Sequence, residues 1–148
     1  MTMAPALMLI DVVVAPPIDV GQVGARDRRC IHITGGKVSG SYSGAVLAGG
    51  ADWQTIGPDG TIDLHARYVL DLDEGRVEVD SRGLRAGPED VLARLARGEL
   101  VDPALYYFRT ALRFYTAAPA YDRLNRVLAV AHGERRPGGV RLSVYEVA

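Results

Sequence analysis

Residues 61–82, TIDLHARYVLDLDEGRVEVDSR, decide the fold that this sequence predicts. The first half alternates between apolar and polar side chains, which is typical of a half-buried β-strand. One predicted face carries the apolar set Ile62, Leu64, Ala66, Tyr68, Leu70 and Leu72. Residues 73–75, Asp-Glu-Gly, indicate a tight turn, and residues 76–82 alternate again. The stretch therefore predicts an antiparallel hairpin.

Strands are also predicted before and after this hairpin. They cover residues 7–14, 29–34, 105–116, 126–134 and 139–147, with two bent strands within 38–47. The prolines, glycines and charges of residues 16–29 indicate a loop or an extended edge segment. The one clear helix is predicted to begin at residues 87–90, Gly-Pro-Glu-Asp, and to end at Gly98. Residues 118–125 indicate a short helical turn.

The order of these elements predicts the architecture. About eight or nine short strands in hairpin order, with one short helix, are typical of an all-β, mostly antiparallel barrel. We expect a single domain over residues 1–148, and a two-sheet sandwich is the alternative fold. A closed barrel of about eight strands has room for one small ligand.

Composition and the N-terminus restrict the function classes. A net charge of -1 favours neither nucleic acid nor an anionic membrane as a partner. The apolar start of the chain lacks a basic region, is interrupted by Asp11 and ends at Pro16-Pro17, so we expect a strand and not a signal peptide or membrane span. Cys30 is the only cysteine, which excludes an intrachain disulfide and fits a reducing cytoplasm.

Residues 35–54, GGKVSGSYSGAVLAGGADWQ, hold six glycines and then an acid, a large aromatic residue and an amide. Glycine suits strands that bend or that approach a ligand closely. One interpretation is a curved strand that leads into the mouth of a small-molecule pocket. The other is that the glycines only turn barrel corners and that Trp53 only fills the core.

Three residues are candidates for catalysis. Asp52, beside Trp53, would have a raised pKa in a dry pocket and could serve as general acid or base; the alternative is a solvated loop acid. Tyr68 could point its hydroxyl into the cavity and stabilise an oxyanion, or be an ordinary core tyrosine. Arg109 could hold a carboxylate or enolate, or lie on the outer face or at a dimer interface.

Aromatic residues are the candidates for ligand binding. Trp53, Tyr106 and Phe108 are expected to form the apolar walls of the pocket. Strict alternation places Phe108 and Arg109 on opposite faces of their strand. Only one of these two side chains can therefore line the cavity unless a bulge intervenes.

Motifs for cofactors are missing from the sequence. His32, His65 and His132 fall on three separate predicted strands without the spacing of metal ligands. There is also no phosphate-binding loop and no dinucleotide fingerprint. We therefore expect no metal and no organic cofactor.

Several short motifs occur together, and as a set they are specific. They are GG-x3-G, G-x-V-L-x-G-G-A-D-W-Q, D-x-x-A-R-Y, D-x-G, R-G, G-P-x-x-V-L-A-R-L-A-R-G-E-x-V-D-P, Y-Y-F-R-T and G-E-R-R-P-x-G-V, at residues 35–40, 44–54, 63–68, 73–75, 82–83, 87–103, 106–110 and 133–140. With these motifs the chain resembles the bacterial and fungal family known as domain of unknown function 3237. The resemblance implies a small β-barrel, similar in outline to allene oxide cyclase and often a homodimer. Most members have no assigned activity.

These observations lead to three hypotheses about function. The first is a cofactor-independent enzyme that cyclises, isomerises, cleaves or hydrolyses an apolar, oxygenated small molecule, such as a polyketide-like or terpenoid intermediate, by acid–base catalysis. The second is a small-molecule carrier or sensor with the same pocket and no chemistry. The third is a structural dimer whose barrel is packed solid.

Overall fold

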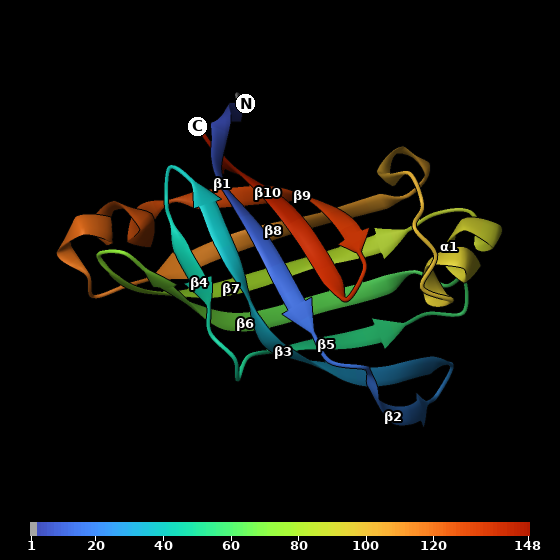
Figure 1. Ribbon diagram of the computed structural model, residues 1–148. Coiled ribbons are helices and arrows are strands. Elements are labelled where there is room, and N and C mark those ends of the chain that lie inside the picture. Colours follow the sequence, from blue (N-terminus) through green and yellow to red (C-terminus); the bar gives the residue numbers. More distant parts are fainter. Residues whose placement is uncertain (1–2) are drawn as a thin grey trace.

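The computed structural model describes residues 3–148, and it shows ten strands, one α-helix and two short 3₁₀ helices (Figure 1). The strands are β1 (Met3–Val14), β2 (Ile18–Val23), β3 (Arg26–Gly40), β4 (Gly44–Val46), β5 (Ala51–Ile56), β6 (Ile62–Leu72), β7 (Gly75–Ala86), β8 (Tyr107–Tyr115), β9 (Leu128–Arg136) and β10 (Gly139–Val147). The helices are α1 (Glu89–Ala96), η1 (Pro103–Leu105) and η2 (Pro119–Arg126). In this part of the chain no helix is long and apolar enough to cross a membrane.

The sheet closes on itself, which confirms the all-β antiparallel barrel. The pairing runs β1-β10-β9-β8-β7-β6, and β4 and β5 both pair with β6 and β3. β3 returns to β1, from Met8↔Gly40 to Val14↔Ile33, and this pairing closes the ring. The result is an eight-stranded barrel with two extra strands, and the alternative of two separate sheets does not hold.

The hairpin predicted from residues 61–82 is confirmed and is longer than predicted. β6 and β7 pair without interruption from Ile62↔Arg85 to Leu72↔Gly75. β7 therefore continues beyond Arg82, and the alternation of its side chains continues with it. As a consequence Arg85 is buried on the same side of the sheet as Val77 and Val79.

Strand breaks were predicted less well than strand cores. Residues 16–29 were predicted as a loop or an extended edge segment; they form a β-hairpin of β2 and the first part of β3, with β2 at an edge of the sheet. β3 then continues through the glycines, because Gly36, at φ +147, lets the backbone bend beside β1. A Cβ at this position would lie 2.1 Å from the carbonyl oxygen of Asp11. β5 was not predicted as a strand; it is held by ladders to both β3 and β6.

The barrel interior is solid at one end and hollow at the other. The buried side chains of the solid end include Leu70, Val77, Val79, Leu112, Phe114 and Val144. Figure 1 shows η2 (orange) at one end of the barrel and α1 at the other. α1 begins at the Pro-Glu-Asp motif as predicted and buries Val91 and Leu95, so that an apolar side faces the barrel. The hollow lies beneath α1.

Candidate functional site

A cavity of about 770 Å³ occupies the α1 end of the barrel. It is formed by inward side chains of β1, β3 and β5 to β10 and by one side of α1. Most of the lining is apolar and includes Val12, Ile33, Leu64, Leu92, Phe108 and Leu142. This volume is in the range of small-molecule sites. It also argues against a barrel that is packed solid.

A glycine makes room for one wall of this cavity. Gly133 lies on the inward face of β9, where a Cβ atom would lie 2.6 Å from ring atoms of Phe108. Real Cβ atoms do not approach so closely, so only glycine allows the ring to lie flat against β9. Phe108 thus becomes a wall of the hollow instead of filling it.

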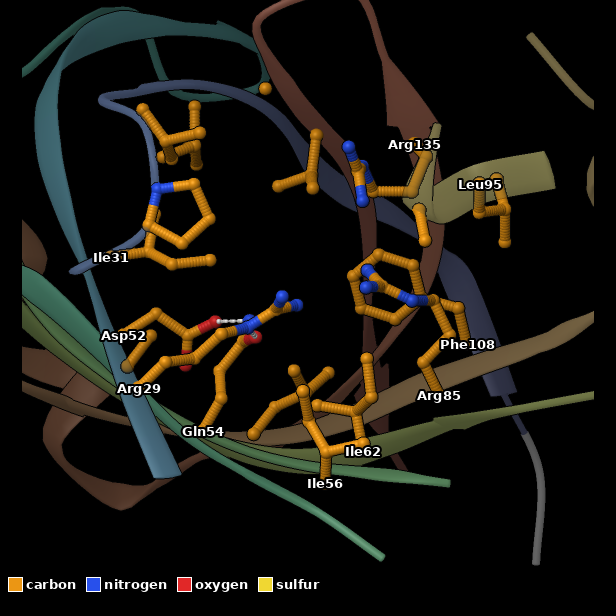
Figure 2. A pocket seen from close by; sticks show the side chains of 18 of the residues that line it. Arg29, Ile31, Asp52, Gln54, Ile56, Ile62, Arg85, Leu95, Phe108 and Arg135 are labelled. Atoms are coloured by element: carbon orange, nitrogen blue, oxygen red, sulfur yellow. Dashed lines mark hydrogen bonds between the residues drawn. The ribbon is translucent and has the colours of Figure 1, made fainter. Parts of the chain in front are cut away.

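Strand β5 places an acid and an amide side by side in the cavity. Asp52 and Gln54 are two residues apart, so both face inward. Nε2 of Gln54 donates to Oδ2 of Asp52 at 2.7 Å, and the backbone N–H of His65 donates to Oδ1 at 3.1 Å. Nε of Arg29, on the paired strand β3, donates to Oε1 of Gln54 at 2.7 Å. An arginine, an amide and a carboxylate are therefore linked in one row (Figure 2).

Asp52 is the ionisable acid inside the cavity. Burial raises the pKa of this carboxyl above its ordinary value. The hydrogen bonds from Gln54 and His65 and the charges of Arg85 and Arg29 lower the pKa, but they do not fully offset burial. A carboxyl group with a raised pKa can both accept and donate a proton closer to neutral pH.

Tyr68 brings a free hydroxyl to the same space. The residue is 4% exposed and lines the cavity, and its hydroxyl has no hydrogen-bond partner among the described residues. Burial, and to a smaller extent the charge of Asp52, raises the pKa of this hydroxyl, so it stays protonated. Oγ1 of Thr110, also in the cavity wall, is likewise buried without a partner in residues 3–148. A polar ligand atom would satisfy such groups.

Three arginines line the cavity as well. In Figure 2 the side chains of Arg29, Arg85 and Arg135 extend from different walls toward the same hollow. Arg85 is 4% exposed, and its Cζ lies 5.5 Å from the centroid of the Phe108 ring. Burial, followed by the charges of Arg135 and Arg29, lowers the pKa of Arg85 to about 10. Burial also lowers the pKa of Arg29 and that of Arg135.

The structure brings together three of the six residues singled out from the sequence. Asp52, Tyr68 and Phe108 all line the cavity. Tyr106 is buried beside it, and its hydroxyl accepts a hydrogen bond of 2.9 Å from the backbone N–H of Arg135. Tyr106 thus supports the cavity from behind its lining.

The other two lie on the outside of the barrel. Trp53 is 51% exposed and borders an outer hollow of about 460 Å³ with His65 and Arg67. Arg109 donates from Nη1 to the carbonyl oxygen of Phe108 at 2.9 Å and lies over Tyr107. Strand alternation is the reason, because Trp53 follows the inward Asp52 and Arg109 follows the inward Phe108.

Sequence reasoning missed the three cavity arginines, although each follows an inward alternation. Arg29 is in step with Ile31 and Ile33, Arg85 with Val77 and Val79, and Arg135 with Ala129 and Ala131. The signal that could have found them is a charged residue where an apolar alternation ends. For metals, residues 3–148 contain no group of three or more His, Cys, Asp or Glu side chains that could hold an ion.

Comparisons with known proteins agree with this architecture. The family model described as protein of unknown function (DUF3237) matches residues 2–147. A UPF0311 protein of Bradyrhizobium diazoefficiens is 44% identical over 131 residues, which cover 88% of this chain and 86% of that protein. The crystal structure of a conserved protein of unknown function from Rhodopseudomonas palustris has a TM-score of 0.92 at 38% identity and covers 100% of this chain and 99% of its own.

A more distant structure shares the fold. A protein from Penicillium herquei, described as an enzyme, has a TM-score of 0.73 at 20% identity, covering 99% of this chain and 94% of its own. At this level of identity the likeness concerns the barrel alone.

Proposed function

The chain belongs to the DUF3237 family of proteins of unknown function, and from this premise we propose that it is a cofactor-independent enzyme that acts on an apolar, oxygenated small molecule in the barrel cavity. One observation carries the proposal. Asp52, with its raised pKa, faces a largely apolar cavity that also receives the hydroxyl of Tyr68, which has no hydrogen-bond partner in the part of the chain that the structure describes. A proton carrier and a neutral hydrogen-bond donor in a largely apolar cavity are the elements of acid–base catalysis.

The two residues take different roles in this proposal. Asp52 removes or delivers a proton on the substrate, and its hydrogen bonds from Gln54 and His65 hold the carboxylate in one orientation. Tyr68 donates its hydroxyl to a carbonyl oxygen that gains negative charge. Cyclisation, isomerisation and lyase reactions of a polyketide-like intermediate can proceed by such a proton transfer beside a carbonyl; in a hydrolysis Asp52 would take the proton from the attacking water. The barrel of Penicillium herquei, described as an enzyme, supports a catalytic role for this architecture by analogy.

A carrier or sensor is the second candidate, and the way in which α1 covers the cavity favours it. Leu92 and Leu95 of this helix line the hollow, so a bound molecule would be shielded from water. A carrier needs no ionisable group in contact with its ligand. Affinity independent of pH, together with a ligand that is unchanged after incubation, would favour this function over catalysis.

The test begins with the molecule that the protein carries in its host. Native mass spectrometry followed by denaturation identifies that molecule, and wild type, Asp52→Asn and the control Asp63→Asn are then incubated with it. Asp63 is an exposed acid on the neighbouring strand β6. We expect Asp52→Asn to lower turnover by about 100-fold or more, and Asp63→Asn to leave it unchanged. Intact turnover in Asp52→Asn would remove Asp52 from the mechanism.

The homodimer expected from the resemblance is part of this proposal as well. Sedimentation equilibrium measures it directly. Trp53 and Arg109, which lie on the outer wall, take no part in the proposed chemistry and are available to such an interface.

A further inference from the structure

We propose that Arg29, Arg85 and Arg135 form an anion subsite and that the ligand is an amphiphilic acid, with its carboxylate on these arginines and its apolar body in the barrel. This inference rests on the proposed function because it concerns the same cavity. It adds the chemical class of the ligand, which neither the family nor the acid–base proposal supplies.

Arg85 is a cation buried in the wall of the cavity. The side chain is nine-tenths buried, it lines the cavity, and its Nε has no hydrogen-bond partner among residues 3–148. The ring of Phe108 holds the guanidinium on one face and leaves its edge toward the hollow (Figure 2). A buried cation with an unsatisfied donor costs free energy that a bound anion would recover.

Like charges gather around the same hollow. The side chains of Arg29, Arg85 and Arg135 extend toward one hollow (Figure 2). Burial lowers the pKa of Arg85 most, and the charges of Arg135 and Arg29 lower it further. Within the described residues, none of the three forms an ion pair of 4.0 Å or less with a carboxylate. Like charges gathered without a counterion are typical of a site for an anion.

The acids around the cavity do not neutralise this cluster. Asp52 is the inward carboxylate, and both of its oxygens accept hydrogen bonds from other groups. Asp59 and Glu89 also border the cavity but are exposed, and Asp59 is bonded to Thr61. The inner part of the cavity therefore holds three arginines and one inward carboxylate, and the two other acids of the lining lie exposed at its border.

The lining decides which anion fits. A guanidinium group can donate two parallel hydrogen bonds to the two oxygens of a carboxylate, and it can bind a phosphate in the same way. Beyond the arginines most of the wall is apolar, with Leu64, Leu142 and Val12 facing the hollow. An apolar body with one acidic group matches both parts, whereas a multiply charged metabolite would leave charge against apolar side chains.

Matched probes test the proposal without knowledge of the natural ligand. Binding of 2-naphthoate, 2-naphthamide and 2-naphthyl phosphate is measured by isothermal titration calorimetry. The three share one apolar body and differ in the group that would meet the arginines. We expect the wild type to bind naphthoate about tenfold more tightly than naphthamide. If naphthyl phosphate binds more tightly than naphthoate, the arginines prefer a phosphate group, and the proposal that the ligand is a carboxylic acid is overturned.

Variants then locate the subsite. Arg85→Met and Arg135→Met should each abolish the preference for the acid and leave naphthamide binding unchanged. The control Arg113→Met, in which the arginine also lies over an aromatic ring but on the outside of the barrel, should keep the preference. A preference that persists in both cavity variants overturns the subsite.

The outcomes separate this inference from the proposed function. Equal affinity of the wild type for naphthoate and naphthamide overturns the anion subsite. This measurement uses the wild type alone, so it does not depend on whether a variant folds. The role of Asp52 would still be tested by the turnover experiment. Loss of turnover in Asp52→Asn with no preference for acids would support the enzyme and reject the acid substrate. Failure of all three probes to bind overturns the subsite, while the host ligand still tests the enzyme.

Discussion

Gln54 donates a 2.7 Å hydrogen bond from Nε2 to Oδ2 of Asp52. The same amide accepts from Arg29 through its oxygen, which fixes the orientation of the amide and makes the nitrogen point at the carboxylate. Gln54 is itself buried, so water does not replace it in this role. The protonation state of Asp52, the proposed proton carrier, therefore depends on the neutral amide of Gln54 as well as on the surrounding charges.

Replacing Gln54 by leucine should raise the pKa of Asp52. The hydrogen bond from Gln54 lowers this pKa, so its loss leaves the effect of burial less opposed. The measurement is a carbon-13 NMR titration of the Asp52 carboxyl in wild type and Gln54→Leu. Thr55→Val is the control, since Thr55 lies on the same strand but bonds Arg28 on the exposed side. A pKa of Asp52 that falls in Gln54→Leu would contradict the assignment.

Asp52→Asn should become more stable relative to wild type as pH rises. The folded-state pKa of Asp52 lies above its ordinary value of 3.8, so the folded protein binds this proton more tightly than the unfolded chain. The contribution of this proton to the free energy of unfolding is fully present below pH 3.8, and it is lost as the pH rises through the pKa of Asp52 in the folded protein. Asparagine does not titrate, so the difference in free energy of unfolding grows over this window and then levels off.

Urea denaturation of both proteins at a series of pH values measures this difference. Asp63→Asn, which removes an exposed acid on the neighbouring strand β6, is the control. A difference between Asp52→Asn and wild type that stays constant across the window would mean that Asp52 has the same pKa in both states.

The fold could be predicted because apolar and polar residues alternate along most strands, which indicates the side of each strand that faces the barrel interior. β6 alternates from Ile62 to Leu72, and the turn at residues 73–75 fixes its register with β7. β5 could not be predicted in this way. Its Asp52 and Gln54 are polar yet inward, and the two ladders to β3 and β6 that hold it are non-local contacts.

The site could be predicted only in part for the same reason. Asp52 was a candidate because it lies beside Trp53, and Tyr68 was one because it lies on the apolar face of its strand. Both line the cavity. Arg29, Arg85 and Arg135 are ordinary in sequence, and two of them, Arg85 and Arg135, lie beyond the predicted ends of their strands. Closure of the barrel makes them neighbours, and no spacing along the chain records it.

Tyr68→Phe should not destabilise the protein. The buried hydroxyl has no partner among the described residues, so its removal relieves a desolvation cost and should raise the free energy of unfolding by about 1 kcal/mol. Tyr121→Phe is the matched control, because that hydroxyl accepts a 3.0 Å hydrogen bond from the backbone N–H of Glu74. The control should lose about 1 kcal/mol. Urea midpoints give both values, and a loss in Tyr68→Phe equal to that of the control would show that Tyr68 has a hidden partner.

Gly133→Ala should destabilise the barrel and narrow the cavity. The added Cβ would lie 2.6 Å from the ring of Phe108, so the ring must move toward the hollow, and overpacking of this kind costs about 1–3 kcal/mol. Gly35→Ala is the control, since a Cβ there meets nothing within 4 Å and the backbone is not left-handed. The free energy of unfolding, measured by urea denaturation, and the affinity for naphthamide should both fall in Gly133→Ala. Both should stay at the wild-type values in Gly35→Ala. A lower free energy of unfolding with unchanged naphthamide affinity would mean that Phe108 does not line the space in which the probe binds, because moving a lining ring into that space must change the affinity.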